Sequence, residues 1–207
     1  MIRLLIGDAN LLIRTGIRTV LTEAFTIDEV GEVASAAELL ANLRAREWSL
    51  CVLDVALPER CGLDVASYVR KARGNTRLLF LSSYADRPYV ASALREGARG
   101  FILKDCARAD LQAAVRTILD GGFYVSPQLS EQLLGVPFSE RPSHERLSLR
   151  ELQVFRKLAR GAALKVISRD LSISPKSVST YRARILEKTR CRNNAEIAQY
   201  ALREGLL

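Results

Sequence analysis

Short apolar runs alternate with amphipathic segments along residues 1–125, and this alternation limits the fold more than any other feature. The runs predict strands, and the segments between them, whose apolar residues recur at helical spacing, predict helices. Strands are expected at 2–7, 28–34, 49–53, 77–81 and 100–103, and helices at 11–21, 36–46, 63–73, 87–96 and 110–119. Because five strands alternate with five helices through short connections, the expected fold is α/β with a five-stranded, doubly wound parallel sheet.

The third expected strand carries the most informative residue of this half. Its run Cys51–Leu53 is apolar at every position, which indicates a strand buried on both faces, and it leads directly into Asp54. Ligands of open parallel sheets bind at the carboxyl ends of the strands, so Asp54 is expected at the mouth of the sheet. Taken alone, the same carboxylate is equally consistent with a helix cap or a pairing with a lysine.

Polar side chains end four of the five expected strands. Asp8 follows the first, Asp54 the third, Ser82 and Ser83 the fourth and Lys104 the fifth, and these ends converge on one rim of the sheet. Two carboxylates with an oxygen-rich loop suit Mg²⁺. A carboxylate can also be phosphorylated, and the new charge is then stabilised by a lysine, a hydroxyl and a metal. The alternative is a set of unrelated polar residues that satisfy loop backbone.

The C-terminal part has a different pattern. Three prolines in residues 126–146 predict a linker, within which residues 129–134 are interpreted as a short helix. Residues 147–207 predict only helices, four in number. The expected organisation is therefore an α/β domain at 1–125, a linker at 126–146 and a small all-α domain at 147–207.

The expected helices of this small domain have clear start signals. The pattern Ser148 to Glu151 is a capping box, and Gly161 is a typical helix end. A second helix is expected at 164–171, and a third follows Ser174 as its cap, while a fourth begins near residue 194. Two short helices joined by a tight turn, the second polar and basic on its outer side, are typical of a helix-turn-helix.

The positive charge of the chain is concentrated in this C-terminal part. Residues 1–125 hold 16 Lys and Arg against 15 Asp and Glu, a net +1, whereas residues 126–207 hold 15 against 8, a net +7. A basic segment beside a near-neutral body indicates an anionic partner. Nucleic acid is the first candidate, and an anionic membrane surface is the second.

Cysteine and histidine usage favours a reducing compartment without a zinc site. The four cysteines are widely spaced and His144 is the single histidine, so a paired Cys/His metal motif is absent from the sequence. No signal peptide is recognisable, and no apolar run approaches the roughly 20 residues that span a bilayer. A cytoplasmic protein without a membrane partner is expected.

Short motifs occur in a fixed order along nearly the whole chain. The first half holds Asn10, Arg14-Thr15-Gly16, Leu53-Asp54, Leu57-Pro58, Gly62, Leu81-Ser82, Gly100-Phe101 and Leu103-Lys104-Asp105. The second half holds Leu147, Arg150-Glu151, Gly161, Lys165, Ser174 through Tyr181, Leu186 and Lys188. In this order and spacing the chain resembles a two-domain response regulator of the NarL/FixJ type, with a receiver, a linker and a LuxR-type helix-turn-helix.

For the receiver, the resemblance implies a role for each polar strand end. Asp54 matches the phosphoacceptor, Lys104 the lysine that contacts the phosphate, and Ser82 the switch hydroxyl. Phe101 matches the aromatic residue that repacks when this hydroxyl moves, and simple core packing is the alternative for it. A sensor histidine kinase is the implied source of phosphate.

The receiver pattern departs from the family at one position. Related receivers usually have two adjacent acidic residues after the first strand, and this chain has Asp8 followed by Ala9. The resemblance implies Mg²⁺ ligands at Asp8, Asp54 and the carbonyl of Ala56, with the direct acidic ligand missing at Ala9. Since second-shell losses alone lower metal affinity 10–100-fold, we expect weakened Mg²⁺ binding.

For the C-terminal domain, the resemblance implies binding to double-stranded DNA as a homodimer, with RNA polymerase as a further partner. The recognition helix is expected at 175–188. Base contacts are expected from Ser179, Thr180 and Ala183, and phosphate contacts from Lys165, Lys176, Arg182, Arg184 and Lys188. The last helix would pair two domains through Ile197, Ala198 and Ala201. A solvated helix face is the alternative for the basic residues.

The predicted function is a non-enzymatic, DNA-binding transcriptional regulator of a two-component phosphorelay, controlled through phosphorylation of Asp54. Two alternatives remain open from the sequence. The first is a phosphatase-type enzyme with Asp54 as nucleophile, which leaves the helix-turn-helix unexplained. The second is a regulator whose receiver acts as a phosphorylation-independent dimerisation or protein-interaction module, because Ala9 replaces an acid.

Overall fold

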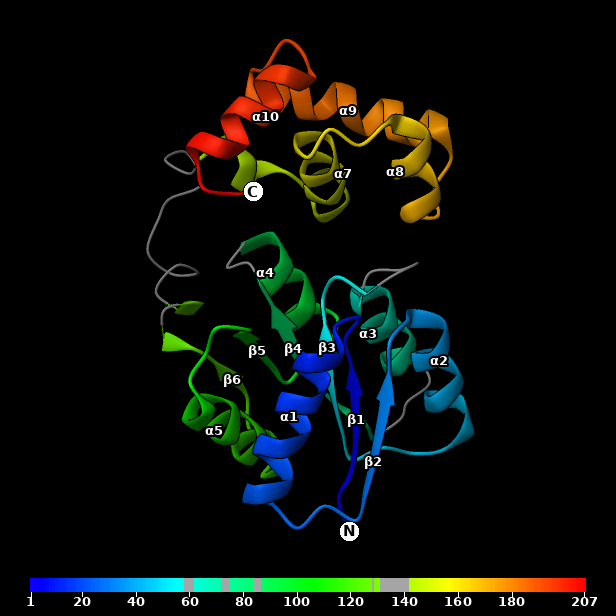
Figure 1. Cartoon of the computed structure of the whole chain (residues 1–207), viewed down its shortest axis with the longest axis vertical. Helices are drawn as coiled ribbons and strands as arrows, with labels where there is room; N and C mark the ends of the chain where they lie inside the picture. Colours follow the sequence, from blue (N-terminus) through cyan, green and yellow to red (C-terminus); the bar gives the residue numbers. More distant parts are fainter. Residues whose placement is uncertain (58–61, 72–74, 84–86, 128, 131–141) are drawn as a thin grey trace. The chain divides into compact units, whose positions relative to one another are not determined.

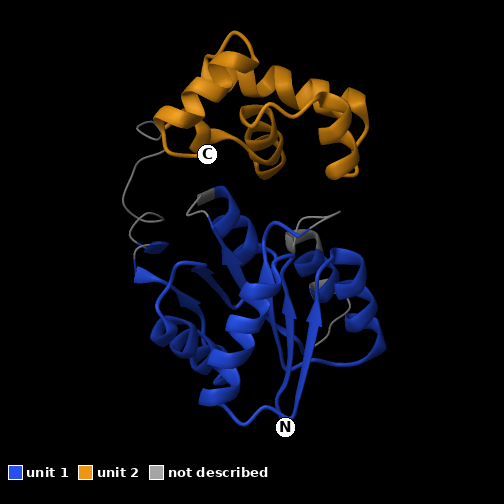
Figure 2. Ribbon diagram, in the orientation of Figure 1, with its two compact units in different colours: residues 1–134 blue, residues 135–207 orange. Residues whose placement is uncertain are grey.

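A computed structural model describes residues 1–57, 62–71, 75–83, 87–127, 129–130 and 142–207. The chain divides into two compact units, residues 1–134 and 135–207, coloured separately in Figure 2. In the part of the chain that is described, no helix has the length and apolar character needed to cross a membrane.

Unit 1 is a parallel sheet with helices on both faces (Figure 1). The strand order is β2-β1-β3-β4-β5-β6, and every neighbouring pair is parallel. The strands are β1 Arg3–Gly7, β2 Glu29–Val33, β3 Leu50–Asp54, β4 Arg77–Ser82, β5 Gly100–Leu103 and β6 Tyr124–Val125. The helices are α1 Leu11–Ala24, α2 Ala36–Ala45, α3 Gly62–Lys71, α4 Arg87–Arg95 and α5 Arg108–Leu119. The predicted fold class is confirmed.

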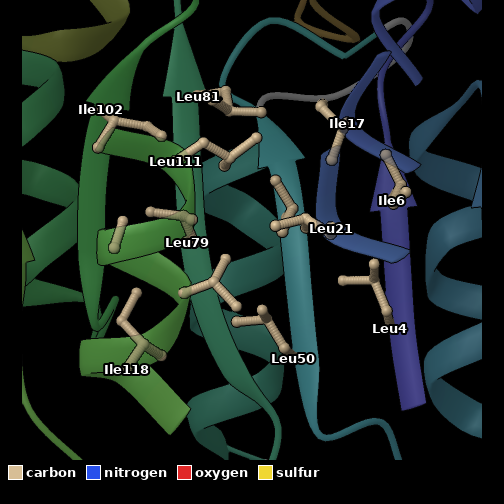
Figure 3. Packing of buried hydrophobic residues seen from close by; sticks show 13 residues of the cluster. Leu4, Ile6, Ile17, Leu21, Leu50, Leu79, Leu81, Ile102, Leu111 and Ile118 are labelled. Carbon is tan, nitrogen blue, oxygen red and sulfur yellow. The ribbon is translucent and has the colours of Figure 1, made fainter. Parts of the chain in front are cut away.

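The core explains why the central strands lack an apolar/polar alternation. All five residues of β3 are buried, because helices cover both faces of the sheet. On one face, residues of α1 and α5 pack on alternate strand residues, as Figure 3 shows. This cluster contains Leu4, Ile6, Ile17, Leu21, Leu50, Val52, Leu79, Leu81, Ile102, Leu111, Ala114, Val115 and Ile118. The intervening strand residues, such as Leu53 and Phe80, point to the opposite face.

The sixth strand, β6, is an addition that the sequence did not predict. It is two residues long and extends the sheet edge, with Tyr124 opposite Gly100 and Val125 opposite Phe101. The packing is tight at Gly100, where an added Cβ would lie 2.8 Å from Ile118 Cδ1 and 2.9 Å from the carbonyl oxygen of Tyr124. A glycine therefore allows the edge strand to approach β5.

Most helix limits in unit 1 lie close to the expected ones. The start of α5 differs, since the helix begins at Arg108 rather than at Asp110. The carboxylate of Asp110 accepts the backbone N–H of Ala107 at 3.3 Å and so stabilises the earlier turn. Of the short helix interpreted at 129–134, residues 131–134 lie outside the described residues.

Unit 2 is helical. A short 3₁₀ helix, η2 Ser143–Arg146, precedes α7 Leu149–Ala159, α8 Leu164–Asp170, α9 Pro175–Thr189 and α10 Asn194–Arg203. The predicted capping box forms at Ser148 and Glu151, and Ser174 caps α9 by accepting the N–H of Ser177 at 3.0 Å. Packing of α9 and α10 on α7 gives the unit its core, which includes Leu152, Phe155, Val178, Ile185 and Ile197.

Candidate functional site

The sheet brings three of the expected polar residues of unit 1 into direct contact at one rim. Asp54 is the last residue of β3, and Asp8 and Lys104 directly follow β1 and β5. The ammonium nitrogen of Lys104 lies 2.6 Å from Asp8 Oδ2 and 2.9 Å from Asp54 Oδ2. Because parallel strands end at the same edge, three residues that are far apart in sequence form one charged cluster.

Backbone groups hold the remaining carboxylate oxygens. Asp54 Oδ1 accepts the N–H of Ala56 at 3.0 Å, and Asp8 Oδ1 accepts the N–H of Asn10 at 2.8 Å. Asp8 is 1% exposed and Asp54 is 7% exposed, so both charges depend on these partners rather than on bulk water. The cluster is thus fixed before any ligand arrives.

The same contacts determine the protonation of the cluster. Burial raises the pKa of Asp54 above its ordinary value, the N–H of Ala56 and the ammonium of Lys104 oppose this rise, and the charge of Asp8 adds to it. For Lys104, burial alone would lower the pKa, but hydrogen bonds to Asp8 and Asp54 outweigh burial and raise it. Lys104 is therefore held firmly in its charged form between two carboxylates.

Ser82 and Phe101, the two residues predicted to act as a switch, lie at different depths. Ser82 ends β4 and is buried at 3% exposure, and its carbonyl accepts the backbone N–H of Lys104 at 2.8 Å. Phe101 lies in the middle of β5 with no exposed surface, in register with Phe80 on β4 and Val125 on β6. The structure therefore places Ser82 at the rim and Phe101 in the core.

The oxygen donors at the rim fit a sparsely coordinated Mg²⁺. The donors are the carboxylates of Asp8 and Asp54 and the carbonyl of Ala56, whereas Ala9 offers no side-chain oxygen. Among the described residues, no group of three or more His, Cys, Asp or Glu side chains is arranged to hold a metal. Mg²⁺ commonly binds through one or two carboxylates and retains several waters, so this donor set is compatible with the ion.

Arg14 is a residue near this rim whose contacts the sequence did not predict. Its Nη1 donates to the backbone carbonyl of Asp8 at 2.7 Å, and its Nε donates to Glu32 Oε2 at 3.3 Å. The side chain is only 13% exposed. Arg14 therefore fixes the loop that carries Asp8 and Ala9, a role that its place in the first turns of a helix did not reveal.

The second candidate site is the outer face of α9 in unit 2. Five of the expected residues share this exposed face, namely Lys176, Ser179, Thr180, Ala183 and Arg184. Lys165 is exposed on the preceding helix, α8. Glu187 also lies on this exposed face, four residues after Ala183, and is not among the residues predicted from the sequence. Glu187 lies at helical spacing from Thr180 and Ala183, and this spacing could have predicted that it shares their face.

Two of the expected phosphate contacts have partners inside unit 2. Arg182 Nε donates to Asn194 Oδ1 at 2.7 Å, which connects α9 to the start of α10. Lys188 Nζ lies 2.6 Å from Glu151 Oε2. Contacts of Arg182 and Lys188 with DNA stay a prediction, and each of these side chains already stabilises the unit.

The expected dimerisation residues on α10 need a correction. Ile197 and Ala201 have no exposed surface, because α10 packs on α7 and turns both side chains into the core of the unit. They are therefore unavailable to a second copy. Ala198 is partly exposed, and Leu202, one turn later, is 68% exposed. Together with the exposed Ala195 in the first turn, Ala198 and Leu202 form the outward apolar surface of this helix.

Comparisons with known proteins agree with the two units. Residues 4–116 match the family described as response regulator receiver domain, and residues 145–201 match bacterial regulatory proteins of the luxR family. The chain is 35% identical over 198 residues to the transcriptional regulatory protein UhpA of Salmonella typhimurium, covering 96% of each chain. It is 30% identical over 210 residues to the response regulator GacA of Pseudomonas viridiflava, covering 100% of this chain and 98% of GacA. A structure of RcsB from Salmonella enterica serovar Typhimurium, bound to the rprA promoter with the phosphomimetic BeF3⁻, shares the fold at 22% identity, with a TM-score of 0.75 over 96% of this chain and 97% of that one.

Proposed function

The chain belongs to the NarL/FixJ response regulators, non-enzymatic DNA-binding transcriptional regulators controlled by a receiver domain, and we propose that Asp54 is its phosphoacceptor. The observation that carries this proposal is the position of Lys104, whose ammonium lies 2.9 Å from Asp54 Oδ2. A receiver implies a kinase partner. In this reading a phosphohistidine of that kinase is the donor, and the chain works in the cytoplasm.

The residues around Asp54 have distinct roles in this reaction. An oxygen of Asp54 attacks the phosphorus, the bond from phosphorus to the histidine nitrogen breaks, and an acyl phosphate forms. Lys104 stabilises the charge on the phosphoryl oxygens, and the hydroxyl of Ser82 moves to contact one of them. Phe101 then occupies the space that Ser82 leaves, which shifts the receiver between two states.

Receivers typically depend on Mg²⁺, and in this chain the ion would be held by Asp8, Asp54 and the carbonyl of Ala56. When bound, the ion neutralises negative charge on the phosphoryl oxygens. With alanine at position 9, water replaces a charged ligand, so we propose that Mg²⁺ binds at least 10-fold more weakly than it does in the Ala9→Asp variant. Lys104 supplies the compensating positive charge that the pocket retains without metal.

The test is incubation with acetyl phosphate, with and without Mg²⁺, followed by intact mass measurement. Wild type should gain one phosphoryl group with a weak dependence on Mg²⁺, and Asp54→Asn should gain none. Ala9→Asp should gain the group faster, and Mg²⁺ should raise its thermal midpoint more than that of wild type. Equal labelling of wild type and Asp54→Asn would exclude Asp54 as the acceptor.

A second candidate function is favoured by the same cluster. Lys104 already neutralises charge on both Asp8 and Asp54, so the receiver rim is stable without phosphate. In that reading the receiver is a phosphorylation-independent dimerisation or protein-interaction module. The mass experiment separates the two, because this alternative requires an unlabelled wild type beside a labelled Ala9→Asp variant.

For unit 2, we propose that α9 enters the major groove with its exposed face. Ser179, Thr180 and Ala183 meet base edges, while Lys165, Lys176 and Arg184 contact phosphates. Arg182 and Lys188 join the phosphate contacts only by exchanging their partners Asn194 and Glu151. Two copies pair on DNA through the outward surface of α10 that Ala198 and Leu202 form.

The test for the DNA proposal is the salt dependence of binding to a mixed-sequence duplex, followed by fluorescence anisotropy. Affinity should fall steeply with salt, and Lys176→Ala should reduce the slope by about one unit, because one phosphate contact is lost. Arg108→Ala, which removes a charge on the receiver, is the matched control and should leave the slope unchanged. A flat salt response of wild type would contradict the assignment of α9.

A further inference from the structure

We propose that Ser179 and Thr180 read base edges as hydrogen-bond acceptors, so that the DNA site of this regulator presents amino groups to them. The inference rests on the proposed insertion of α9 into the major groove. It adds the chemical identity of the groups that are recognised, adenine N6 or cytosine N4, and it follows from the hydrogen bonds that the two hydroxyls donate within α9.

Both hydroxyls on the exposed face of α9 already use their single proton. Ser179 Oγ donates to the carbonyl of Pro175 at 3.1 Å, and Thr180 Oγ1 donates to the carbonyl of Lys176 at 3.0 Å. A hydroxyl has one donor and two acceptor lone pairs. With the proton directed back along the helix, the lone pairs remain for an external group. Both side chains are exposed, so nothing in unit 2 shields these lone pairs.

The residues around the two hydroxyls allow them to come close to base edges. Ala183 follows Ser179 and Thr180 on the same exposed face and adds only a methyl group, so at this position the helix can come close to the groove floor. Lys176 and Arg184 stand one turn before and one turn after Thr180, where phosphate contacts can fix the register. The hydroxyls therefore occupy the centre of the face that enters the groove.

Arg182, two residues after Thr180, already has a partner inside unit 2. Arg182 could read guanine O6 and N7 as a bidentate donor, but its Nε donates to Asn194 Oδ1 at 2.7 Å and its side chain is half-buried. While this hydrogen bond to Asn194 is kept, Arg182 has fewer N–H groups to donate to a guanine near Ser179 and Thr180. Ser179 and Thr180 themselves offer acceptor lone pairs to the groove.

Acceptor lone pairs discriminate between base edges. In the major groove, adenine N6 and cytosine N4 are donors, while guanine O6 and N7 and thymine O4 are acceptors. An amino group can bond to Ser179 or Thr180 while their bonds to the preceding turn stay intact. Reading an acceptor requires the hydroxyl to give up its bond to that turn, which lowers affinity by about two- to tenfold per position.

The test uses the full-length chain and a duplex enriched by it from a library with a randomised central segment. In that duplex, single adenines are replaced by purine, which lacks the N6 amino group, and single cytosines by 2-pyrimidinone, which lacks the N4 amino group. Binding is measured by anisotropy for wild type, Ser179→Ala, Thr180→Val and Thr180→Ser.

Deletion of one amino group should weaken wild-type binding by about two- to tenfold. It should not weaken binding by the variant that lacks the hydroxyl contacting that amino group. Thr180→Ser keeps the hydroxyl and should behave as wild type at the amino group that Thr180 reads. The matched control is Thr22→Val in the receiver, where Thr22 Oγ1 donates to Arg18 O at 2.9 Å in the same manner. It should change no base preference.

Three outcomes would overturn the inference. The first is coupling of the two residues to guanine or thymine acceptors, probed with 7-deazaguanine and with 4-thiothymine. The second is the absence of coupling to any base. The third is a library without an enriched sequence while salt-dependent binding persists, which leaves the proposed function intact. Loss of salt-dependent binding altogether would instead contradict the proposed function.

Discussion

Lys188 Nζ, near the end of α9, lies 2.6 Å from Glu151 Oε2 in the first turn of α7. The same carboxylate oxygen accepts the backbone N–H of Ser148 at 2.7 Å and so completes the capping box. Glu151 is 2% exposed. One buried carboxylate therefore joins α9, the helix proposed to contact DNA, to the start of α7, which makes the orientation of α9 part of the fold of unit 2.

We predict that Lys188→Ala destabilises unit 2 by about 1–2 kcal/mol. The substitution leaves the buried carboxylate of Glu151 without its charged partner. The expected destabilisation is smaller than for a fully buried ion pair, because the side chain of Lys188 is 39% exposed. Urea unfolding followed by far-UV circular dichroism measures it. Lys176→Ala, an exposed lysine on the same helix, is the control and should change stability by less than about 0.5 kcal/mol. Equal effects of the two substitutions would contradict the structural role.

The same pair predicts a pH dependence in the acid range. Burial raises the pKa of Glu151, but hydrogen bonds from Lys188 and Ser148 outweigh it and hold the pKa below the ordinary value of 4.5. A lowered carboxylate pKa stabilises the fold fully above the ordinary value, and this contribution is lost as the pH falls through the lowered pKa. The stability advantage of wild type over Glu151→Gln should thus be constant above about pH 5.5 and shrink below about pH 4.5. An advantage that persists unchanged at lower pH would count against the assignment.

Two glycines of the receiver should respond to alanine in opposite directions. Gly16 lies within α1 and nothing lies within 4 Å of an added Cβ, so Gly16→Ala should stabilise by about 0.5–1 kcal/mol. At Gly100, an added Cβ would meet Leu79 Cδ1 at 2.9 Å as well as α5 and β6, so Gly100→Ala should destabilise by about 1–3 kcal/mol. Trp48, the single tryptophan, is buried in unit 1 and reports unfolding of that unit by fluorescence. Equal signs for both substitutions would refute the packing at Gly100.

The spacing of apolar residues was sufficient to predict the fold of the receiver and most of the polar cluster at the carboxyl ends of its strands. The apolar run before Asp54 and the polar ends of the strands at Asp8 and Lys104 are local patterns, and parallel topology alone brings them together. The prediction that failed, that of the dimerisation residues on α10, depends on tertiary packing. The pattern of α10 shows that Ile197 and Ala201 are apolar, yet it cannot tell whether they face α7 or a second copy.

The two-residue strand β6 and the contacts of Arg14 were missed for a related reason. A dipeptide such as Tyr124–Val125 carries no periodicity, and its pairing depends on the space beside Gly100. Arg14 contacts a backbone carbonyl and Glu32, which lies 18 residues along the chain. Neither interaction has a counterpart in local sequence spacing.

Glu187 should oppose DNA binding. Glu187 is exposed on the same face of α9 as Thr180 and Ala183, and under the proposed insertion of α9 into the major groove its carboxylate would repel DNA phosphates. Glu187→Gln should therefore strengthen binding to all duplexes by roughly threefold at low salt, with a smaller gain at high salt because exposed charges are screened. Anisotropy with two unrelated duplexes measures it. A gain confined to one of the duplexes would mean that Glu187 reads a base instead.

The two apolar sides of α10 should separate dimer formation from folding. Leu202→Ala removes an exposed side chain and should leave stability within about 0.5 kcal/mol, while weakening cooperative binding to a duplex with two half-sites. Ile197→Ala opens a cavity in the core and should cost about 2–5 kcal/mol of stability. Analytical ultracentrifugation on DNA and urea unfolding measure the two effects. Unchanged cooperativity in Leu202→Ala would place the dimer contact elsewhere.

The direction of β6 determines at which residue a different C-terminal domain should be fused to this receiver. Because β6 runs parallel to β5, the chain leaves the receiver at the carboxyl edge of the sheet, the edge that carries Asp54. A chimera cut after α5, at Asp120, would discard the strand opposite Gly100 and Phe101 and begin the graft from the opposite edge. A graft that begins at Ser126 keeps the exit at the edge of the sheet that carries Asp54, so chimeric regulators built from this receiver should retain residues 1–125.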